Sequence, residues 1–437
     1  MRYFVGMGEV AGVLSGISTG FSQLGIKADL YLFGPHPHAY QFQPNIFTKC
    51  FFFLYRVRMK WGVLGISVVP LRFSLTLILF IYSLFKYDIF IFTGFGSFFR
   101  FYELPFLKLF NKKIVVIYLG SDARPPYLSG VYLDENNGVI PVSEVKTKIR
   151  KMLRRIFLVE SFADVIVNHT ATAQFMKRKF IPLLYLGLPI DIVNITKIAD
   201  SSKAIVPKSK KVIKIIHAPS RTRAKGSTQI KNTINELNDE LNVYGLQLEL
   251  VELTNRSNVD VIAEIASCDF VVNELYADNF LSILDAEAAV LGKPSLKFGY
   301  YAEHIIYDNK TAVMPENLIY FEPQKLKDII RLYAMDETLR LRSGENIKKF
   351  VIEEWSGKRV AERLESFLVE VNTSKDSDKL VDPGKLNYLF GWGLPKYLLY
   401  ENLNIYINEV GEKGLHLPDR LMSLLRDELD CAKLSND

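Results

Sequence analysis

The sequence predicts an α/β protein of two tandem Rossmann-like domains that face each other across a cleft, followed by a C-terminal extension. Its 437 residues exceed what one hydrophobic core usually serves, at roughly 100 to 200 residues per domain. Short apolar runs alternate with helix-like runs, the pattern of a parallel sheet covered on both faces. This pattern breaks once, at a polar, lysine-rich stretch. We therefore expect one domain over residues 1–191, a linker over 192–211 and a second domain over 212–355.

The first domain begins with a strand, a glycine-containing loop and a helix. The strand is RYFVG, and the helix pattern lies in VAGVLSGISTGFSQLG. The later apolar runs that we interpret as strands are KADLYLFG (27–34), YDIFIFTGF (87–95), KIVVIYLG (113–120) and ADVIVNHT (163–170). The run ELPFLKLF separates two of these strands and has a helical pattern. This succession is the strand-helix-strand rhythm of a parallel sheet.

From residue 212 the same rhythm returns and predicts a second open α/β domain. The predicted strands are VIKIIHA (212–218), LQLELVEL (246–253), CDFVVNEL (268–275), PSLKF (294–298) and a short one near TAVM (311–314). The helices expected between them cover 227–241, 258–267 and 280–292. Two helical segments follow, in 323–355 and 356–372. Residues 373–437 combine a polar linker, an aromatic stretch and an amphipathic helix, with no predicted role beyond packing or partner contact.

Charge and cysteine content limit the classes of partner. The formal net charge is +6 and the pI about 8.9, which suits phosphorylated ligands or an anionic membrane better than nucleic acid, which needs dense basic patches. Cys50, Cys268 and Cys431 lie far apart without metal-ligand spacing, so neither a disulfide framework nor a zinc site is expected. The N-terminus lacks the pattern of a signal peptide. We expect a cytoplasmic protein that does not bind nucleic acid.

One part of the first domain has membrane-like features. FSLTLILFIYSLF (73–85) is strongly apolar but shorter than the roughly 20 residues of a spanning helix, so we expect a core or interfacial helix. KCFFFLYRVRMKWGVLG (49–65) interleaves aromatic and basic residues, and KIRKMLRRIF (148–157) could extend the same face. Such a mixture can rest in the headgroup layer of an anionic bilayer, or it can form a half-buried element with a wet basic edge. Peripheral membrane contact is therefore one of two open interpretations.

The loop HAPSRTRAKGST (217–228) is the strongest local signal for a ligand. It ends the first strand of the second domain and opens a helix, whose free N–H groups and dipole favour an anion. Arg221, Arg223 and Lys225 add positive charge, and Gly226 lets the backbone approach a ligand closely. The pattern predicts a diphosphate-binding loop, with a solvated basic turn as the alternative.

A second stretch, NELYADNFLSILDAEAAVLGKP, places a carboxylate in an apolar helix. Glu287 lies among alanines, and a glycine and a proline end the helix in the usual manner. A buried carboxylate is costly unless it is paired, and the hydroxyl groups of a ribose would be good partners. Asp278 and Asn279 precede the helix, and we expect one of them to cap it.

These segments, taken in order over residues 1 to about 370, resemble a GT-B glycosyltransferase of the retaining family 4 type. In that family an Arg and a Lys-Gly pair on a strand-tip loop bind the nucleotide diphosphate. Arg221 or Arg223, with Lys225 and Gly226, match these residues. The resemblance also implies that residues 356–372 form a helix that crosses back to the first domain.

The family next has two Glu residues separated by seven positions. The second, which holds the ribose, matches Glu287, whereas the first, which contacts the donor sugar, is Asn279 here. Asp278 beside it could compensate, or Asn279 could bind sugar hydroxyl groups itself. GYYAEHIIYDNKTAVM resembles the segment that follows in the family, with Glu303 at its acidic position.

Three loops of the first domain resemble the family's remaining cleft loops, namely GMGEVAG, FTGFGSFF and YLGSDARPP. The resemblance places Gly8 and Gly12 against the donor phosphate and the acceptor. The third loop usually has a His before Gly-Ser-Asp, and this chain has Leu119 there. Asp122 and Arg124 are the polar candidates in that loop, with a local salt bridge as the alternative interpretation.

The resemblance implies transfer of a sugar from a nucleotide-diphosphate donor to a saccharide or lipid-linked acceptor, with retention of configuration, in bacterial-type surface polysaccharide or glycoconjugate synthesis. The candidate catalytic residues are Asp122, Arg221, Lys225 and Asn279. The loop cations and the helix N-terminus would offset the charge of the departing diphosphate, so neither a metal nor another cofactor is expected. The leaving phosphate would itself deprotonate the acceptor hydroxyl group.

Other classes stay open. Asn279 and Leu119 depart from the family and favour a catalytically inactive GT-B protein that binds a nucleotide sugar or a partner enzyme. GMGEVA also satisfies the dinucleotide-binding fingerprint, but an NAD-dependent oxidoreductase needs an acid at the end of the second strand, and Asp29 is at its start. An epimerase would show acids and histidines on the first domain's loops, where they are sparse. His217 is expected to bond at a strand end and is only a weak catalytic candidate.

Overall fold

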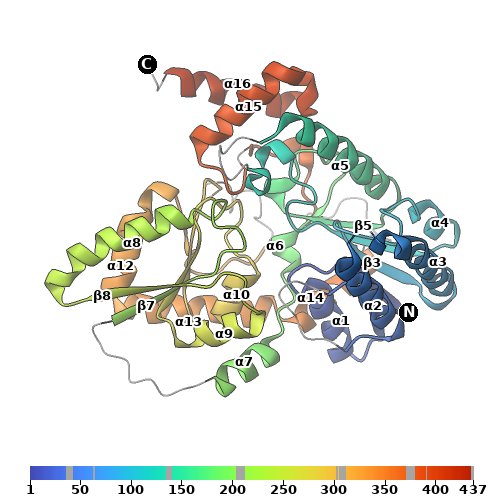
Figure 1. The fold of residues 1–437 in the computed structure, drawn as a ribbon, viewed down its shortest axis with the longest axis horizontal. Coiled ribbons are helices and arrows are strands. Elements are labelled where there is room, and N and C mark those ends of the chain that lie inside the picture. The colour runs from blue at the N-terminus through green and yellow to red at the C-terminus, as the bar shows by residue number, and fades with distance from the viewer. Residues whose placement is uncertain are drawn as a thin grey trace.

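A computed structural model describes residues 1–35, 43–62, 64–133, 140–202, 212–301, 304, 312–370, 379–389 and 391–434. Over these residues the chain forms two parallel α/β domains and a helical C-terminal extension (Figure 1). The extension stands beside α5 of the first domain. The predicted fold class, two tandem Rossmann-like domains with a C-terminal extension, is confirmed.

The first sheet is parallel, in the order β2-β1-β3-β4-β5-β6. Its strands are β1 (Tyr3–Met7), β2 (Ala28–Leu32), β3 (Ile89–Thr93), β4 (Lys113–Ile117), β5 (Val165–Asn168) and β6 (Ile181–Pro182). The helices of this domain are α1 (Val13–Gln23), α2 (Ile46–Trp61), α3 (Val69–Lys86), α4 (Leu104–Leu109), α5 (Val142–Phe162) and α6 (Leu183–Leu186). The strand order reverses between β1 and β3, so the loops after these two strands meet at the carboxyl edge of the sheet.

The second sheet is also parallel, in the order β11-β10-β9-β7-β8. Its strands are β7 (Val212–His217), β8 (Gln247–Glu252), β9 (Phe270–Glu274), β10 (Ser295–Phe298) and β11 (Tyr320–Phe321). Its helices are α8 (Ser227–Leu241), α9 (Asn258–Ser267), α10 (Ile283–Val290), α12 (Leu326–Met335) and α13 (Glu337–Glu354). The strand expected near TAVM is wrong for residues 312–314, which form no strand, and β11 takes the edge instead.

Two helices connect the domains. Residues 192–201, expected within the linker, form α7 (Ile192–Ser201), which packs against α9 and α10. The local reason is that Asp191 caps this helix at the Asn194 N–H (3.1 Å) and one apolar stripe of it is buried. The helix α14 (Gly357–Glu370) lies along α1 of the first domain, where Gly20 and Gly357 allow close contact.

The C-terminal extension belongs to the core of the first domain. Its helices are α15 (Lys396–Val410) and α16 (Asp419–Leu434). Tyr406 stacks on Tyr127 with ring centroids 5.7 Å apart, and the Tyr127 hydroxyl group donates to the Leu415 carbonyl (2.9 Å). Leu403, Leu415 and Leu425 are fully buried in the same apolar cluster. The extension is therefore a packed part of the molecule.

Candidate functional site

A cavity of about 440 Å³ lies between the two domains, at the carboxyl ends of both sheets. Its walls come from the loops after β1, β4 and β5 and, across the gap, from the loops after β7, β8 and β9. Three of the predicted site residues line it together, Lys225, Asn279 and Glu287. This is the position where doubly wound domains bind ligands.

The basic loop after β7 is shaped by one glycine. Gly226 has a φ of 70°, and a Cβ there would come within 2.7 Å of the Leu275 Cβ, so only glycine fits without strain. Lys225 is consequently held inward and is 9% exposed. Its Nζ donates to the Asn273 Oδ1 (2.9 Å) and lies 3.6 Å from a carboxylate oxygen of Glu274. An ammonium group has three N–H donors, so these partners leave capacity for a ligand.

The two arginines of this loop lie apart from the cavity wall. Arg221 and Arg223 are exposed, and Arg221 Nη1 donates to the Val131 carbonyl of the first domain (2.8 Å). The wall has a different arginine, Arg256, which sequence analysis missed. Its signal was weak, because only its place in the loop after β8 distinguishes it from an ordinary surface cation.

Glu287 is 5% exposed on the cavity wall. The Asn258 side-chain amide donates to its Oε1 (2.8 Å). Burial raises the pKa of Glu287 to about 7, which means that the site holds an ionised carboxylate poorly without a further donor. The hydroxyl groups of a ribose are donors of the kind that this carboxylate needs.

Asn279 and Trp355 line the cavity, and each has one buried polar atom without a partner among the described residues. The Asn279 Oδ1 and the Trp355 indole N–H have no hydrogen-bond partner among the described residues. Buried polar groups are nearly always bonded, so each such atom indicates a missing donor or acceptor. Asn279 does not cap α10, and neither does Asp278, so that expectation was wrong. The N-cap of α10 is instead Ser282, whose N–H donates to the Asp285 carboxylate (2.6 Å) in a capping box.

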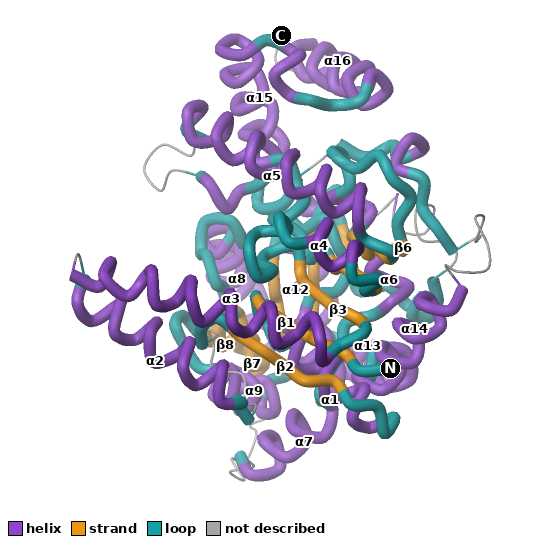
Figure 2. Tube along the Cα trace, turned by 90° about the vertical axis from the view of Figure 1, so that its right-hand side faces the viewer, coloured by secondary structure: helices purple, strands orange, loops and turns teal. Residues whose placement is uncertain are grey.

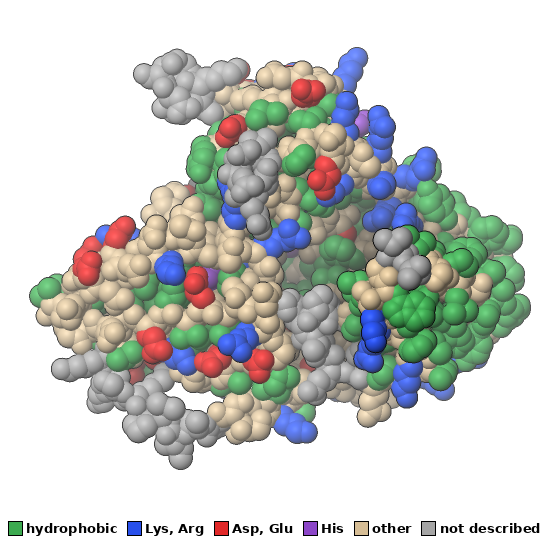
Figure 3. Space-filling view, in the orientation of Figure 1, with side chains coloured by type: hydrophobic (Ala, Val, Ile, Leu, Met, Phe, Trp, Pro, Cys, Tyr) green, Lys and Arg blue, Asp and Glu red, His purple; other side chains and the backbone are tan. Residues whose placement is uncertain are grey.

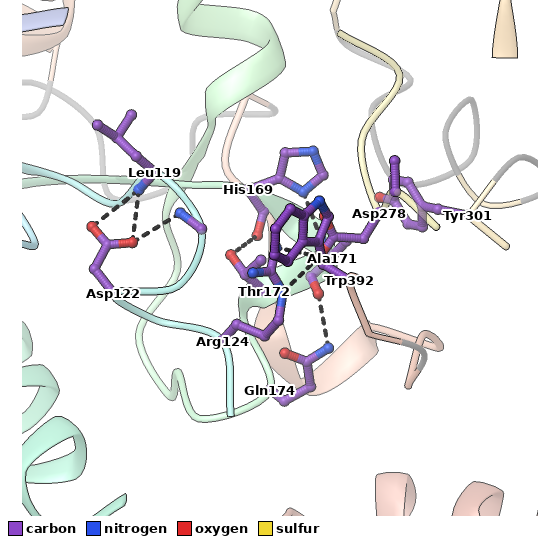
Figure 4. Close-up of polar contacts among 12 residues, drawn as sticks. Leu119, Asp122, Arg124, His169, Ala171, Thr172, Gln174, Asp278, Tyr301 and Trp392 are labelled. Carbon is purple, nitrogen blue, oxygen red and sulfur yellow. Dashed lines mark hydrogen bonds and ion pairs between the residues drawn. The ribbon is translucent and has the colours of Figure 1, made fainter. Parts of the chain in front are cut away.

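Asp278 pairs with Arg124 across the two domains. The Arg124 Nε and Nη2 donate to the Asp278 Oδ2 at 2.8 and 2.5 Å, and both side chains are almost fully buried (Figure 4). The alternative of a local salt bridge within the Arg124 loop is therefore wrong, because the guanidinium reaches the other domain. The Asp278 carboxylate is also already engaged at Oδ2, which weakens the idea that it compensates for the missing Glu.

Asp122 is turned onto its own loop. Its carboxylate accepts the backbone N–H groups of Leu119 (3.0 Å) and Gly120 (2.8 Å), as Figure 4 shows, and it is not on the cavity wall. Burial raises the pKa of Asp122 to about 6. Leu119 does line the cavity, so an apolar side chain stands at the position where the sequence resemblance would place a His.

His169 is a polar residue of the wall that sequence analysis missed. It follows β5, and its Nδ1 accepts the Ala171 N–H (3.1 Å), which leaves the proton on Nε2 as a donor. Burial lowers the pKa of His169 to about 4, so the ring is neutral at pH 7. His217, by contrast, has both ring nitrogens engaged, with the Val272 carbonyl and the Ser227 hydroxyl group at 2.7 Å each, in keeping with a strand-end role.

The glycine loop after β1 reaches the cavity through Val10 and Ala11. Gly8 packs against the loop after β3, and Gly12 has a φ of 80° at the start of α1. The carboxylate of Glu9 accepts three backbone N–H groups there, at 2.9 to 3.0 Å. The N–H groups of Val10, Leu14 and Ser15 at the start of α1 are thus occupied by a side chain of the same loop, whereas the predicted contacts of Gly8 and Gly12 stay a prediction.

Glu303 lies outside the described residues, so its predicted contact with the donor is not described by this structure. Among the residues that are described, no group of three or more His, Cys, Asp or Glu is arranged to hold a metal ion.

A buried charge network supports Lys225 from behind. Lys297 is fully buried and lies 2.8 Å from Glu274 and 3.0 Å from Asp285. Burial works to raise the pKa of Glu274, but the charges of Lys225 and Lys297 outweigh it and hold this pKa at about 2. Glu274 is therefore an anion whose position helps to fix the Lys225 ammonium group.

The C-terminal extension completes this network. The Trp392 indole N–H donates to Glu274 Oε2 (2.7 Å), the oxygen that also lies near Lys225, whereas Lys297 contacts Oε1. Trp392 also exchanges backbone hydrogen bonds with Leu128 and Gly130 of the first domain, and the next N–H, of Gly393, donates to the Tyr276 carbonyl of the second (2.7 Å). The segment thus bridges both domains beside the site, a contact that sequence analysis did not foresee.

Two parallel α/β domains, a cavity at the carboxyl ends of both sheets and a late helix that returns to the first domain define a protein of the GT-B glycosyltransferase fold. No family model matches the sequence, and no curated protein matches it.

Three solved structures follow a similar course. One is Anabaena Alr3699/HepE in complex with UDP and glucose, with a TM-score of 0.48 and 14% identity, over 85% of this chain and 100% of that one. Another is the trehalose-6-phosphate synthase OtsA, with a TM-score of 0.46 and 10% identity, over 86% and 99%. The third is WaaG, a glycosyltransferase involved in lipopolysaccharide biosynthesis, with a TM-score of 0.37 and 13% identity, over 83% and 97%. Similarity this low has no bearing on activity, and the GT-B class follows from the topology.

Proposed function

We propose that the protein is a glycosyltransferase that moves a sugar from a nucleotide-diphosphate donor to a saccharide or lipid-linked acceptor. The observation that carries this proposal is the single cavity wall that combines Lys225, Asn279 and Glu287. A nucleotide sugar has an anionic diphosphate, a ribose diol and a sugar with several hydroxyl groups. An ammonium group, a carboxylate that accepts from Asn258 and has capacity for further donors, and an amide oxygen without a partner complement these three parts in turn.

The chemistry follows from the charges on the second domain. Lys225 and the N-terminus of α8 stabilise negative charge as the bond between the anomeric carbon and the diphosphate oxygen breaks. Arg256 on the wall, and Arg221 and Arg223 on the same loop as Lys225, add positive charge to this half of the cleft. Neither a metal nor another cofactor is part of the proposal.

The proposed stereochemical course is retention. The acceptor oxygen forms its bond to the anomeric carbon on the face that the diphosphate leaves, and its proton passes to the departing phosphate. No side-chain base is needed, so Leu119 in place of His is compatible with this step. The neutral His169 offers its Nε2–H to a donor or acceptor hydroxyl group from the opposite wall. The setting that we propose is the cytoplasm, in surface polysaccharide or glycoconjugate synthesis.

The alternative classes differ in their support. A catalytically inactive GT-B protein is favoured by Asn279 and Leu119 and would still bind a nucleotide. An NAD-dependent oxidoreductase has less support, because the Asp29 carboxylate is engaged by Tyr87 (2.6 Å) and Lys86 (2.9 Å), and Glu9 fills the α1 terminus where a pyrophosphate would bind.

A thermal-shift panel of UDP, GDP, ADP, CMP and NAD(H) tests the proposal, because a ligand bound only by the native state raises its unfolding temperature. We expect one nucleoside diphosphate to stabilise the wild type, and Lys225→Ala and Glu287→Ala to remove the effect. The matched controls Lys231→Ala and Glu249→Gln change exposed residues of the same domain and should keep it. The nucleotide identified in this way selects the sugar donors for transfer assays.

A shift with NAD(H) alone would replace the proposal with the oxidoreductase class. Nucleotide binding without transfer to any acceptor would favour the inactive binding protein. A β-linked product from an α-linked donor would exclude retention.

A further inference from the structure

We propose that one outer face of the first domain docks on an anionic phospholipid bilayer, with α3 lying in the headgroup layer. This docking face consists of the exposed sides of α2, α3 and α4 and the adjoining exposed side of α5. It needs no part of the proposed transferase activity, because its binding to vesicles can be measured without a nucleotide.

The outward side of α3 is apolar. Leu71, Leu77, Ile78, Ile81 and Phe85 recur at helical spacing and are 41 to 71% exposed. An ordinary surface helix has polar residues on this side. The mean hydropathy of an 18-residue window in Gly65–Lys86 is 2.0, and only 33% of that window is buried, although by length and composition it would suffice to cross a membrane. Most of this apolar helix therefore faces solvent.

The inward side of α3 prevents it from leaving the domain to span a bilayer. Leu79, Phe80 and Leu84 are buried in the same apolar cluster as the strands β3 and β4. Phe80 packs on Phe98 with ring centroids 5.3 Å apart. Extraction of α3 would empty this core, so a position in the plane of the interface is the arrangement that buries both of its sides.

The apolar surface continues beyond α3. The Phe85 ring lies 6.5 Å from that of Phe110 just after α4, and Phe106 and Leu109 on α4 are 58% and 77% exposed. Phe157 on α5 is 67% exposed. Figure 2 shows α2, α3, α4 and α5 on one side of the molecule, and Figure 3 shows hydrophobic side chains gathered over the edge of the first domain. A continuous apolar surface on this scale indicates a protein or membrane contact.

The charges of the docking face select the partner. Residues 46–86 contain no Asp or Glu, and their basic residues are Lys49, Arg56, Arg58, Lys60, Arg72 and Lys86. The exposed cations of α5 are Lys146, Arg150, Lys151 and Arg154. Apolar side chains bordered by cations match an anionic headgroup layer.

The acids near the docking face are engaged by neighbouring groups. Asp164 binds Lys108 (2.8 Å), Glu160 accepts the backbone N–H groups of residues 177 and 178, Glu144 pairs with Lys148, and Asp88 accepts the Arg2 N–H. Asp29 likewise binds Lys86 (2.9 Å). These five acids each cancel one positive charge, and because the ten basic residues named above outnumber them, the face is net positive. A second copy of this chain, packed through the same face, would bring like charges together, whereas an anionic bilayer neutralises them.

Vesicle cosedimentation of the full chain tests the inference. We expect at least tenfold tighter binding to phosphatidylcholine vesicles that contain phosphatidylglycerol than to phosphatidylcholine alone, with a smaller difference at high salt. Trp61, at the end of α2, is 55% exposed, whereas Trp355 is buried and Trp392 is partly buried away from this face, so Trp61 is the native probe of the docking face. Its emission should shift to shorter wavelength on binding, and brominated lipids should quench it.

Two sets of variants separate the apolar and the electrostatic contributions. Ile78→Gln with Phe85→Gln changes exposed side chains and should weaken binding at low and high salt alike. Arg56→Glu with Lys60→Glu should weaken binding only to the anionic vesicles, by at least about fivefold for each basic residue lost. The matched controls Leu341→Gln and Arg342→Glu alter exposed residues of α13 in the second domain and should bind as the wild type does.

Several results would overturn the inference. One is binding that does not depend on phosphatidylglycerol, another is Trp61 emission that brominated lipids do not quench, and a third is equal loss in the control variants. A wild type that sediments as a dimer, with monomeric Ile78→Gln and Phe85→Gln forms, would show instead that a second copy covers this face.

Discussion

Replacement of Glu287 by glutamine measures how much the buried carboxylate lowers the free energy of unfolding. Burial raises its pKa from an ordinary 4.5 to about 7, so between these values the folded protein binds a proton more tightly than the unfolded chain does. The stability of the wild type therefore falls as the pH rises across this window, and it stays lower above it. A difference of about 2.5 pH units corresponds to about 3 kcal/mol, at about 1.36 kcal/mol per pH unit.

Glutamine cannot ionise, and its carbonyl oxygen can still accept the Asn258 amide N–H that now reaches Oε1. We expect Glu287→Gln to be more stable than the wild type at pH 8, by up to about 3 kcal/mol, and the gain to shrink toward pH 5. The variant should at the same time lose the stabilisation by a nucleoside diphosphate, because a neutral amide is a weaker partner for ribose hydroxyl groups. A gain in stability together with a loss of nucleotide binding is what we expect on replacing a residue whose role in binding lowers the stability of the fold.

Urea unfolding at pH 5 and pH 8 provides the measurement, with Glu249→Gln on the exposed side of β8 as the control. The control should show the same stability difference from the wild type at both pH values. The reasoning is refuted if the gain of Glu287→Gln does not grow with pH, or if the variant keeps the full nucleotide-induced shift.

Three further predictions concern the same wall and its support. Lys225→Met should abolish stabilisation by a nucleoside diphosphate, which calorimetry would show. It should also raise the pKa of Glu274, because the charge of Lys225 is the largest of those that lower it, and the stability of the variant measured across acid pH would report this change. Asn279→Ala should leave the affinity for the nucleoside diphosphate nearly unchanged but weaken the nucleotide sugar roughly tenfold, which paired calorimetric titrations would show. Trp392→Phe keeps an aromatic ring but removes the hydrogen bond to the ionised Glu274, and should cost about 1.5 to 3 kcal/mol in urea unfolding.

The strands and the basic loop were predictable because their signals are local. A buried parallel strand is a short apolar run, and β1, β3 and β5 are each buried along their whole length. The inward Lys225 depends on Gly226 and on the start of α8, all within a few residues of one another. Glu287 was recognisable because a carboxylate among alanines has few purely structural explanations.

The engagement of Asp278 and Asp122 was not predictable from neighbouring residues. Asp278 binds Arg124, 154 positions away, and nothing in either segment indicates the other. Asp122 stands in a loop of the expected type, but its backbone geometry turns the carboxylate onto two N–H groups of that loop. His169 was missed for a related reason, since its role depends on which side of the strand end faces the second domain.

The same limit explains why the C-terminal extension seemed to have no functional connection. The Trp392 segment meets the Leu128 carbonyl so closely at Gly391 that a Cβ there would clash with it, and Gly393 has a φ of 72°. These glycines allow the backbone to bond both domains while the indole reaches Glu274. Glu274 in turn lies beside Lys225, which lines the cavity. The extension thus reaches the basic loop after β7 through two contacts, Trp392 to Glu274 and Glu274 to Lys225. Any opening of the cleft must either break the contact of Trp392 with one domain or carry the extension along with the motion.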